Sequence, residues 1–365
     1  MTESAHDGTV AAAREDFDVF LCGTVFLDIV FTGMLNAPSG GHEIWTDGMG
    51  SSPGGAANLA VACSRLGMRT ALAAAFGGDV YGDFCWSLLE DTEGIDLSRS
   101  RRFEGWHSPV TVSLAFDDDR AMVTHAHPAP VPLDELAAEP PTTRVCCMEI
   151  GSERPTWLDD AIARGSLVFA DSGWDPSETW DVGRLREQLK GAHAFVPNAI
   201  EAMSYTRTDT PGEALEAMRD WIPLAVVTTG SGGAFAADAT TGETAWAPGV
   251  PVDALDPTGA GDVFLAGLIH GTLKDWPLQQ RLRFANLCAA LSVRDFGGAL
   301  AAPGWGEVAK WWNDARTSPR MARDYAFLDD VIPTESPRAV SRASATIGLR
   351  PLLPQPPEPS AERKP

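Results

Sequence analysis

Lysine is scarce in this chain. Only four of the 365 residues are lysines, and none of them follows a glycine-rich loop. The pattern G-x-x-x-x-G-K-[S/T], which cradles phosphates in P-loop proteins, is therefore excluded. Acidic residues outnumber basic ones, and the formal net charge is −22. A surface this acidic repels nucleic acid and anionic lipid, so we expect neither as a partner.

Other absences narrow the class of protein further. The sequence contains no run of 18 apolar residues, so no membrane-spanning helix is expected. Residues 1–16 lack the basic-then-apolar pattern of a secretory signal. The six cysteines form no CxxC pair, which argues against a structural zinc site and favours reduced, buried thiols. We therefore predict a cytoplasmic protein.

The order of strand and helix patterns predicts the fold class. From about residue 143, short apolar strands alternate with amphipathic helices, which is typical of a parallel, doubly wound sheet. Earlier in the chain, one strong strand is predicted over 18–30, and an extended, glycine-punctuated stretch follows over 31–55. Residues 108–125 resemble a strand pair joined at Asp117–Arg120. The chain is long enough for one large α/β domain with a small subdomain.

The sharpest motif reads DALDPTGAGDVFLAG over residues 253–267. The small residues Gly259, Ala260 and Gly261 let the backbone approach a ligand closely, and the free N–H groups of a helix start attract an anion. Asp262 at that start can accept a proton from a substrate hydroxyl while the amides bind a transferred phosphoryl group. The alternative is that Asp262 only caps the helix and the glycines only turn the chain.

A second motif, GGAANLAVACSRLG, covers residues 54–67. Gly54 and Gly55 permit close approach of the backbone to a polyol, and the Asn58 amide can bond hydroxyls as donor and as acceptor. The alternative is a loop with an asparagine near a helix N-cap.

Two weaker motifs lie between these. In FVPNAIEA, Asn198 and Glu201 are three residues apart at a helix start, which suits metal-bound waters and phosphate oxygens; capping alone is the alternative. In AVVTTGSGGAFA, Thr228, Gly230 and Gly233 lie on a glycine-rich turn after a strand. That turn suggests a nucleotide loop or a tight hairpin.

With these four motifs in this order, the sequence resembles the PfkB, ribokinase-like family of carbohydrate kinases over about residues 17–312. The resemblance implies an ATP-dependent kinase that phosphorylates a hydroxyl of a sugar or sugar-like substrate. It implies an α/β fold whose doubly wound, mostly parallel central sheet is flanked by helices. A small β-sheet lid would come from about 30–49 and 108–125. We divide the chain into a flexible extension over 1–16, the kinase domain over 17–333 and a disordered, Pro-rich tail over 334–365.

The resemblance also implies site residues. The catalytic residues are Asp262 as base, with Gly259, Ala260 and Gly261 as the anion hole. The substrate-binding residues are Asp28, Gly54, Gly55, Asn58 and Glu149. The ATP-binding residues are Asn198, Glu201, Thr228, Gly230, Gly233 and Asn286. The cations are Mg²⁺, held through water by Glu201, and a monovalent cation such as K⁺ at Asp256 and Thr258.

The sequence departs from the family pattern in ways that bear on the substrate. Gly55 stands where ribose kinases usually carry a lysine, which disfavours ribose. Few basic residues lie on the proposed substrate side, which disfavours a sugar phosphate as the substrate. Arg101, Arg102 and Arg120 near the lid keep that alternative open. The competing interpretations are a nucleoside (adenosine-type) kinase of the same fold and a catalytically silent sugar-binding protein.

Three further expectations concern the lid. Trp45 and Trp106 lie in or beside it, where their rings can stack on a sugar or a base. His125 and His127 alternate on one strand, but no third ligand is evident in the sequence, so a lid role is favoured over a metal pair. Lids in this family often form dimer contacts, so a homodimer through the lid is expected.

Overall fold

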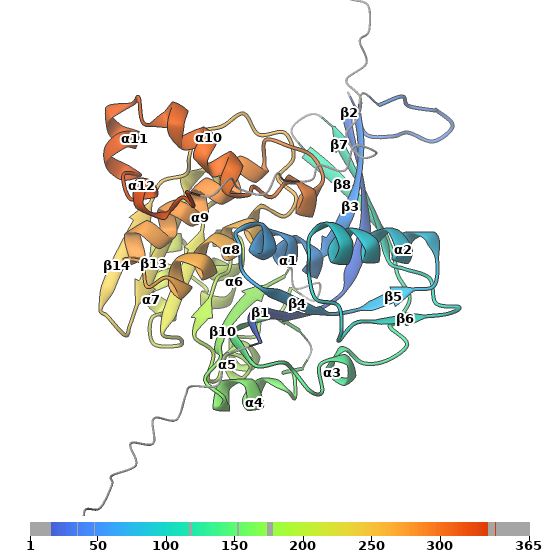
Figure 1. The fold of residues 1–365 in the computed structure, drawn as a ribbon, viewed down its shortest axis with the longest axis horizontal. Helices are drawn as coiled ribbons and strands as arrows, with labels where there is room; N and C mark the ends of the chain where they lie inside the picture. Colours follow the sequence, from blue (N-terminus) through green and yellow to red (C-terminus); the bar gives the residue numbers. More distant parts are fainter. Residues whose placement is uncertain are drawn as a thin grey trace, which may run out of the picture.

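A sheet of eight strands lies at the centre of the molecule (Figure 1). The computed structural model describes residues 16–34, 36–46, 48–116, 119–151, 153–173, 178–334 and 340, so nearly all of the predicted N-terminal extension and C-terminal tail lies outside them. The strand order is β14-β13-β12-β11-β10-β9-β1-β4. Pairing is parallel from β4 to β12 and antiparallel across β12, β13 and β14. The strands are β1 Phe17–Cys22, β4 Thr70–Ala73, β9 Thr143–Ile150, β10 Leu167–Ser172, β11 Ala194–Phe195, β12 Leu224–Thr228, β13 Ala234–Asp238 and β14 Glu243–Ala247.

Helices cover both faces of this sheet, because its strands are apolar on both sides. In β1, Val19 and Leu21 pack into one core cluster, whereas Phe20 between them packs into another. This double burial is typical of parallel sheets. The first cluster lies under α1 Ala56–Arg65, α2 Val80–Ser87, α8 Ala260–Leu273, α9 Leu278–Ser292, α10 Trp305–Ala315, α11 Pro319–Asp324 and α12 Leu328–Val331. The second lies under α3 Leu133–Leu136, α4 Leu158–Ala163, α5 Val182–Gln188, α6 Ala199–Thr206 and α7 Pro211–Met218.

A separate small sheet stands beside the central one (Figure 1). Its order is β3-β2-β7-β8, with β2 parallel to β7 and the other pairs antiparallel. Its strands are β2 Val25–Met34, β3 Gly48–Gly55, β7 Val110–Phe116 and β8 Asp119–His125. The predicted doubly wound α/β fold with a small second sheet is therefore confirmed. A further pair, β5 Ala75–Gly77 and β6 Arg101–Phe103, completes the strands among the described residues.

The prediction of one strand over 18–30 is wrong. The chain leaves the central sheet after Cys22, turns at Gly23 and Thr24, and enters the small sheet as β2. At the turn, the Thr24 carbonyl accepts the backbone N–H of Ala56 at 3.0 Å. A Cβ on Gly23 would lie 2.7 Å from the Ala56 Cβ, so the close approach of the two segments depends on glycine here.

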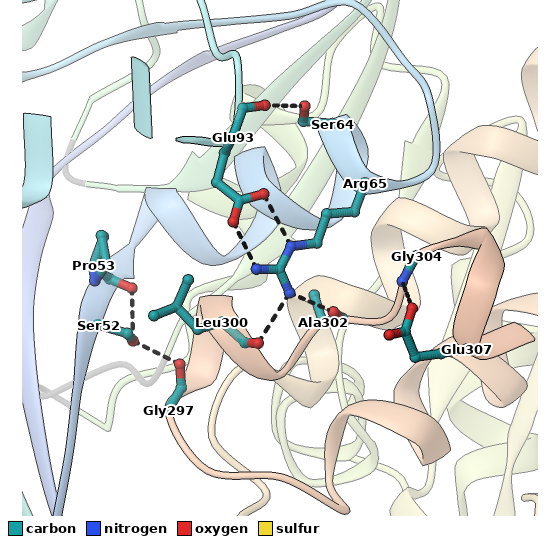
Figure 2. Close-up of polar contacts among 10 residues, drawn as sticks. All are labelled: Ser52, Pro53, Ser64, Arg65, Glu93, Gly297, Leu300, Ala302, Gly304 and Glu307. Carbon is teal, nitrogen blue, oxygen red and sulfur yellow. Dashed lines mark hydrogen bonds and ion pairs between the residues drawn. The ribbon is translucent and has the colours of Figure 1, made fainter. Parts of the chain in front are cut away.

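A buried ion pair fixes the 3₁₀ turn η3, Gly298–Ala301, against α1 (Figure 2). Arg65, at the end of α1, lies 2.6 Å from Glu93, and both side chains are almost fully buried. The same guanidinium donates to the carbonyls of Leu300 at 2.9 Å and Ala302 at 2.6 Å. Its donors thus bridge α1 and two loops that are far apart in sequence, and they hold η3 beside the site described next.

Candidate active site

The start of α8 is built to bring its backbone close to a ligand. Gly259 is the N-cap, with φ 75° and ψ 3°, and it has no side chain to cap the first-turn amides. Only glycine adopts this left-handed conformation readily. A Cβ on Gly259 would lie 3.3 Å from the Asn58 side chain, so the turn is also tightly packed. The positive end of this 14-residue helix therefore favours an anion.

Asp262, in the first turn of α8, lines a cavity of about 270 Å³. Glu149 near the end of β9 and Asp171 near the end of β10 line the same cavity. Ligand sites in parallel sheets form at this carboxyl edge. Other lining residues include Cys22, Gly23, Gly55, Ala56, Ser172 and Gly173. The cavity is thus bordered by three carboxyl groups contributed by different elements.

Burial and mutual repulsion raise the pKa of the carboxyl groups in and beside this cavity. The pKa of Asp262 is raised to about 7. Burial is the largest cause, a hydrogen bond from Asn58 opposes it, and the charges of Glu149 and Asp28 add to it. Burial, followed by the charge of Asp256, raises the pKa of Asp28 to about 6. Burial also raises the pKa of Glu149. Asp262 can therefore take up and release a proton near neutral pH.

The predicted acceptor-side residues gather where the small sheet meets α1. Asp28 on β2 is 8% exposed, and its Oδ2 would lie 1.8 Å from a Cβ placed on Gly54. Gly54 is therefore required for Asp28 to sit there. Asn58 is buried beside them, and its Oδ1 has no hydrogen-bond partner among the residues described. An amide oxygen left this way is able to accept from a ligand hydroxyl.

The backbone at Gly55 explains why this position holds glycine rather than the lysine that ribose kinases usually carry. Gly55 has φ 61°, and a Cβ there would lie 2.4 Å from the Thr24 carbonyl oxygen and 2.8 Å from the Phe26 ring. A side chain would meet both a strained backbone and a collision. The departure at Gly55 is therefore built into the path of the chain from β3 to α1.

Asn198 and Glu201 form a capping box at the start of α6, as their alternative interpretation expected. The Asn198 Oδ1 accepts the Glu201 N–H at 3.1 Å. The Glu201 Oε2 accepts the Asn198 N–H at 2.9 Å and the Ser172 hydroxyl at 2.8 Å. The capping box and the Ser172 hydroxyl both use Oε2 of Glu201, and Ser172 in turn lines the cavity.

Asp171 lines the same cavity, and the sequence interpretation did not include it. Burial raises its pKa well above the ordinary range, and the charges of Asp262 and Glu201 add to that effect. The pKa of Asp171 thus responds both to Asp262 at the start of α8 and to Glu201 on α6. The available signal was its place at the end of a predicted strand next to the strand that carries Glu149.

The predicted nucleotide-binding residues lie on or beside the turn between β12 and β13. Thr228 donates its N–H to Pro197 at 3.1 Å, next to Asn198, and Gly230 opens the 3₁₀ turn η2, Gly230–Gly232. Gly233 has φ 96°, and a Cβ there would lie 2.0 Å from the Ala247 carbonyl oxygen. The Asn286 amide donates to that same carbonyl at 2.9 Å. Asn286 thus holds the loop after β14 against α9.

The proposed cation residues hold a loop together. One oxygen of Asp256 accepts the Thr258 N–H at 3.0 Å, and the other accepts the Gly297 N–H at 3.1 Å. This joins the start of α8 to the turn before η3. Among the described residues, no three His, Cys, Asp or Glu side chains are arranged to hold a metal ion directly.

The tryptophan and histidine side chains expected near the lid do not line the cavity that Asp262 borders. Trp45 is 85% exposed, and Trp106 packs edge-on against Phe103 and donates to the Pro128 carbonyl at 3.0 Å. Neither lines the cavity. The structure does bring a third imidazole, His107, to the His125 and His127 pair, with ring centroids 5.8 and 4.9 Å apart along the series.

Comparison with known proteins identifies relatives of this chain. The pattern of the pfkB family of carbohydrate kinases matches residues 158–304. A nucleoside kinase from Methanothermobacter thermautotrophicus is 28% identical over 70% of this chain and 83% of its own length. A pseudouridine kinase from Escherichia coli is 25% identical over 66% of this chain and 80% of its own length. A fructokinase from Vibrio alginolyticus is 26% identical over 71% of this chain and 91% of its own length.

Solved structures share the fold. A ribokinase from Thermotoga maritima superposes with a TM-score of 0.65 at 19% identity, covering 81% of this chain and 99% of the other. A ribokinase-type structure from E. coli that contains ATP and Mg²⁺ gives 0.67 at 19% identity, with coverages of 81% and 99%. The predicted resemblance to the PfkB, ribokinase-like carbohydrate kinases is therefore confirmed. No described helix is both long and apolar enough to cross a membrane.

Proposed function

We propose that this protein transfers the γ-phosphoryl group of ATP to a hydroxyl of a sugar or sugar-like acceptor, with Asp262 as the catalytic base. One observation carries the proposal. A carboxyl group whose pKa is raised to about 7 stands in the first turn of a helix that begins with an uncapped Gly-Ala-Gly turn, at the edge of a cavity. Kinases of this type place the proton acceptor and the anion-stabilising amides at such a point.

The residues divide the chemical work. Asp28 and Asn58 hold the acceptor, and the ionised Asp262 accepts the proton of the attacking hydroxyl. The amides at the start of α8 stabilise the charge on the phosphoryl group as it moves in line from ADP to the acceptor oxygen. Glu149 lies across the cavity, where it can orient a second hydroxyl of the acceptor.

The donor set fits Mg²⁺ delivered with ATP. Glu201 is buried, Asp171 is half-buried, and the charge of Glu201 raises the pKa of Asp171. Mg²⁺ prefers such hard oxygen ligands, often through water. When bound, Mg²⁺ offsets the charge of the nucleotide phosphates, which this acidic protein otherwise repels. Asn198 keeps Glu201 in place through the capping box. Thr228, Gly230, Gly233 and Asn286 are proposed to line the nucleotide side.

The test is ATP turnover against a panel of hexoses, pentoses, keto-deoxy acids and nucleosides, measured as ADP release. The wild type is expected to use at least one acceptor, and Asp262→Asn is expected to lose nearly all turnover while it keeps the fold. An Asp262→Asn variant with near-normal kcat would refute the assignment of the base. Absence of turnover with every acceptor would instead favour a silent binding protein.

A nucleoside acceptor is the second candidate. The nucleoside and pseudouridine kinases among the relatives favour it. The stacking role expected for Trp45 and Trp106 gains no support, because one ring is exposed and the other is packed. Side-by-side rates with adenosine and with the sugars of the same panel separate the two candidates, since the true acceptor should react much faster.

Further proposals follow from the same resemblance. Small-sheet closure over the acceptor, K⁺ binding at Asp256 and Thr258, a homodimer through the small sheet and a cytoplasmic location all stay predictions. For K⁺, both Asp256 oxygens already accept backbone N–H groups, so a cation would use their remaining lone pairs. Replacing K⁺ by Na⁺ in the turnover assay tests that site.

A further inference from the structure

A row of four polar side chains crosses the whole small sheet. The strand registers place Ser52 and Thr111 on either side of Asp28, and Thr124 next to Thr111. Residues that pair across neighbouring strands project from the same face. We call Ser52, Asp28, Thr111 and Thr124 the polar row.

The polar row begins at the catalytic end of the site. The Ser52 hydroxyl donates to the Gly297 carbonyl at 2.6 Å (Figure 2), and the Gly297 N–H in turn donates to Asp256. The charge of Asp28, the next member of the row, raises the pKa of Asp262. Thr111 and Thr124 continue the row away from this end, and Thr124 is exposed. The row therefore runs from the Gly297 turn, through a carboxylate whose charge affects Asp262, to the surface.

The row has hydrogen-bonding capacity that a hydroxylated acceptor fits. Asp28 is 8% exposed, yet no described residue donates a hydrogen bond to its carboxylate. A buried carboxylate needs donors, and an ionised one can only accept. The Thr111 and Thr124 hydroxyls lie 3.1 Å apart, so one donates to the other and one hydrogen is left for a further partner. Sugar hydroxyls, which donate and accept, meet both needs.

The charges around the row disfavour an anionic acceptor. Asp28 and the three cavity carboxyl groups are all acidic, and no described Lys, Arg or His side chain lines the cavity or belongs to the row. Of the arginines near the small sheet, Arg101 pairs with Glu135 at 2.7 Å and Arg102 pairs with Asp83. The side chain of Arg120 on β8 lies outside the described residues.

We propose that the polar row is the acceptor-recognition surface, that Thr111 and Thr124 are specificity-determining residues, and that the row selects an uncharged polyhydroxylated acceptor over a phosphorylated or carboxylated one. This inference depends on the proposed function for the chemical step. In that step the acceptor oxygen forms a bond to the γ-phosphorus, the bond to the ADP oxygen breaks, and the proton passes to Asp262. The row determines which molecule reaches that step.

Paired acceptors test the charge selection. Ribose with ribose 5-phosphate, fructose with fructose 6-phosphate, glucose with gluconate, and adenosine with AMP are compared by kcat/KM for ADP release. The uncharged member of each pair that reacts is expected to exceed the charged member by about a hundredfold or more, since like charges in such a site are strongly repelled. A preferred charged member overturns the inference but leaves the kinase function intact. No turnover with any acceptor overturns both.

Isosteric variants test the two threonines. Thr111→Val and Thr124→Val keep the β-branched shape and are each expected to raise the acceptor KM about three- to tenfold, the effect of one lost hydrogen bond. The KM for ATP should not change, and Thr111→Ser should restore the acceptor KM. Val123→Thr, on the opposite face of β8 and 63% exposed, is the matched control. If neither valine variant changes the acceptor KM, the inference is overturned. If Thr111→Val folds poorly, an unchanged acceptor KM in Thr124→Val alone overturns it, because Thr124 is exposed and its replacement should not disturb the fold.

Discussion

Replacing Asp262 by Asn should abolish turnover and, at the same time, stabilise the protein above neutral pH. The amide keeps the shape of the side chain and can still accept the hydrogen bond from Asn58, but it cannot accept the substrate proton. Loss of a general base typically costs about 10²- to 10⁴-fold in rate. The gain in stability arises because the folded protein no longer holds a crowded, buried carboxylate.

The size of that gain follows from the pKa. The pKa of Asp262 is about 7 in the folded protein, against an ordinary value of 3.8. The difference is about 3 pH units, and at about 1.4 kcal/mol per unit it corresponds to about 4 kcal/mol. This value is an upper limit, because the side chain is not completely buried and water screens part of the repulsion.

The pH dependence distinguishes this cause from a general packing effect. Since the pKa in the folded state lies above that in the unfolded state, both states are protonated below about pH 4, and the ionisation cost is absent there. The cost grows as the pH rises to about 7 and is then constant. The variant should therefore match the wild type near pH 4 and exceed it most at pH 8.

Urea denaturation at pH 5 and pH 8, followed by tryptophan fluorescence, measures the two free energies of unfolding. Asp253→Asn is the matched control, because Asp253 is an exposed carboxylate on the approach to the same helix. A stability gain of equal size at both pH values would refute the reasoning. So would a variant that turns over ATP at the wild-type rate.

Three further predictions concern the same region. The value of kcat/KM should rise about tenfold per pH unit up to about pH 7 and level off above it, as Asp262 loses its proton; a flat profile between pH 5.5 and 8.5 contradicts this. Arg65→Met should lower the free energy of unfolding by about 3–5 kcal/mol in urea, because it leaves Glu93 buried without its partner, and adding Glu93→Leu should recover most of the loss. Gly55→Ala should cost at least about 2 kcal/mol because of the collision with Thr24, whereas Gly67→Ala, with a positive φ but open space around it, should cost about 1–2 kcal/mol; equal losses would show that backbone conformation alone matters.

Local signals in the sequence were enough to predict the alternating part of the fold. The apolar strands after residue 143 and the helices between them lie where their periodicity placed them. The motif around Asp262 predicted both a tight turn and a helix start, because the glycine conformation and the helix N-terminus are local properties. These elements need no knowledge of distant contacts.

The features that the sequence did not predict depend on distant contacts. Residues 18–30 form one apolar run, and nothing in that run shows that its two halves pair with different sheets. Residues 48–55 are rich in glycine, which disfavours strands, yet they pair with β2, and Gly54 there leaves room for Asp28. Likewise, the alignment of Thr111 with Asp28 is set by strand register, which the sequence does not specify locally.

The path of the chain between the two sheets has a consequence for how the protein unfolds. After β1 in the central sheet, the chain makes β2 and β3, returns to the central sheet with β4, leaves again for β7 and β8, and comes back with β9. The strands of the small sheet therefore come from separate stretches, with a core strand between them. The two sheets are interwoven rather than joined end to end, so neither can be excised as a self-sufficient fragment, and both should melt in a single cooperative transition.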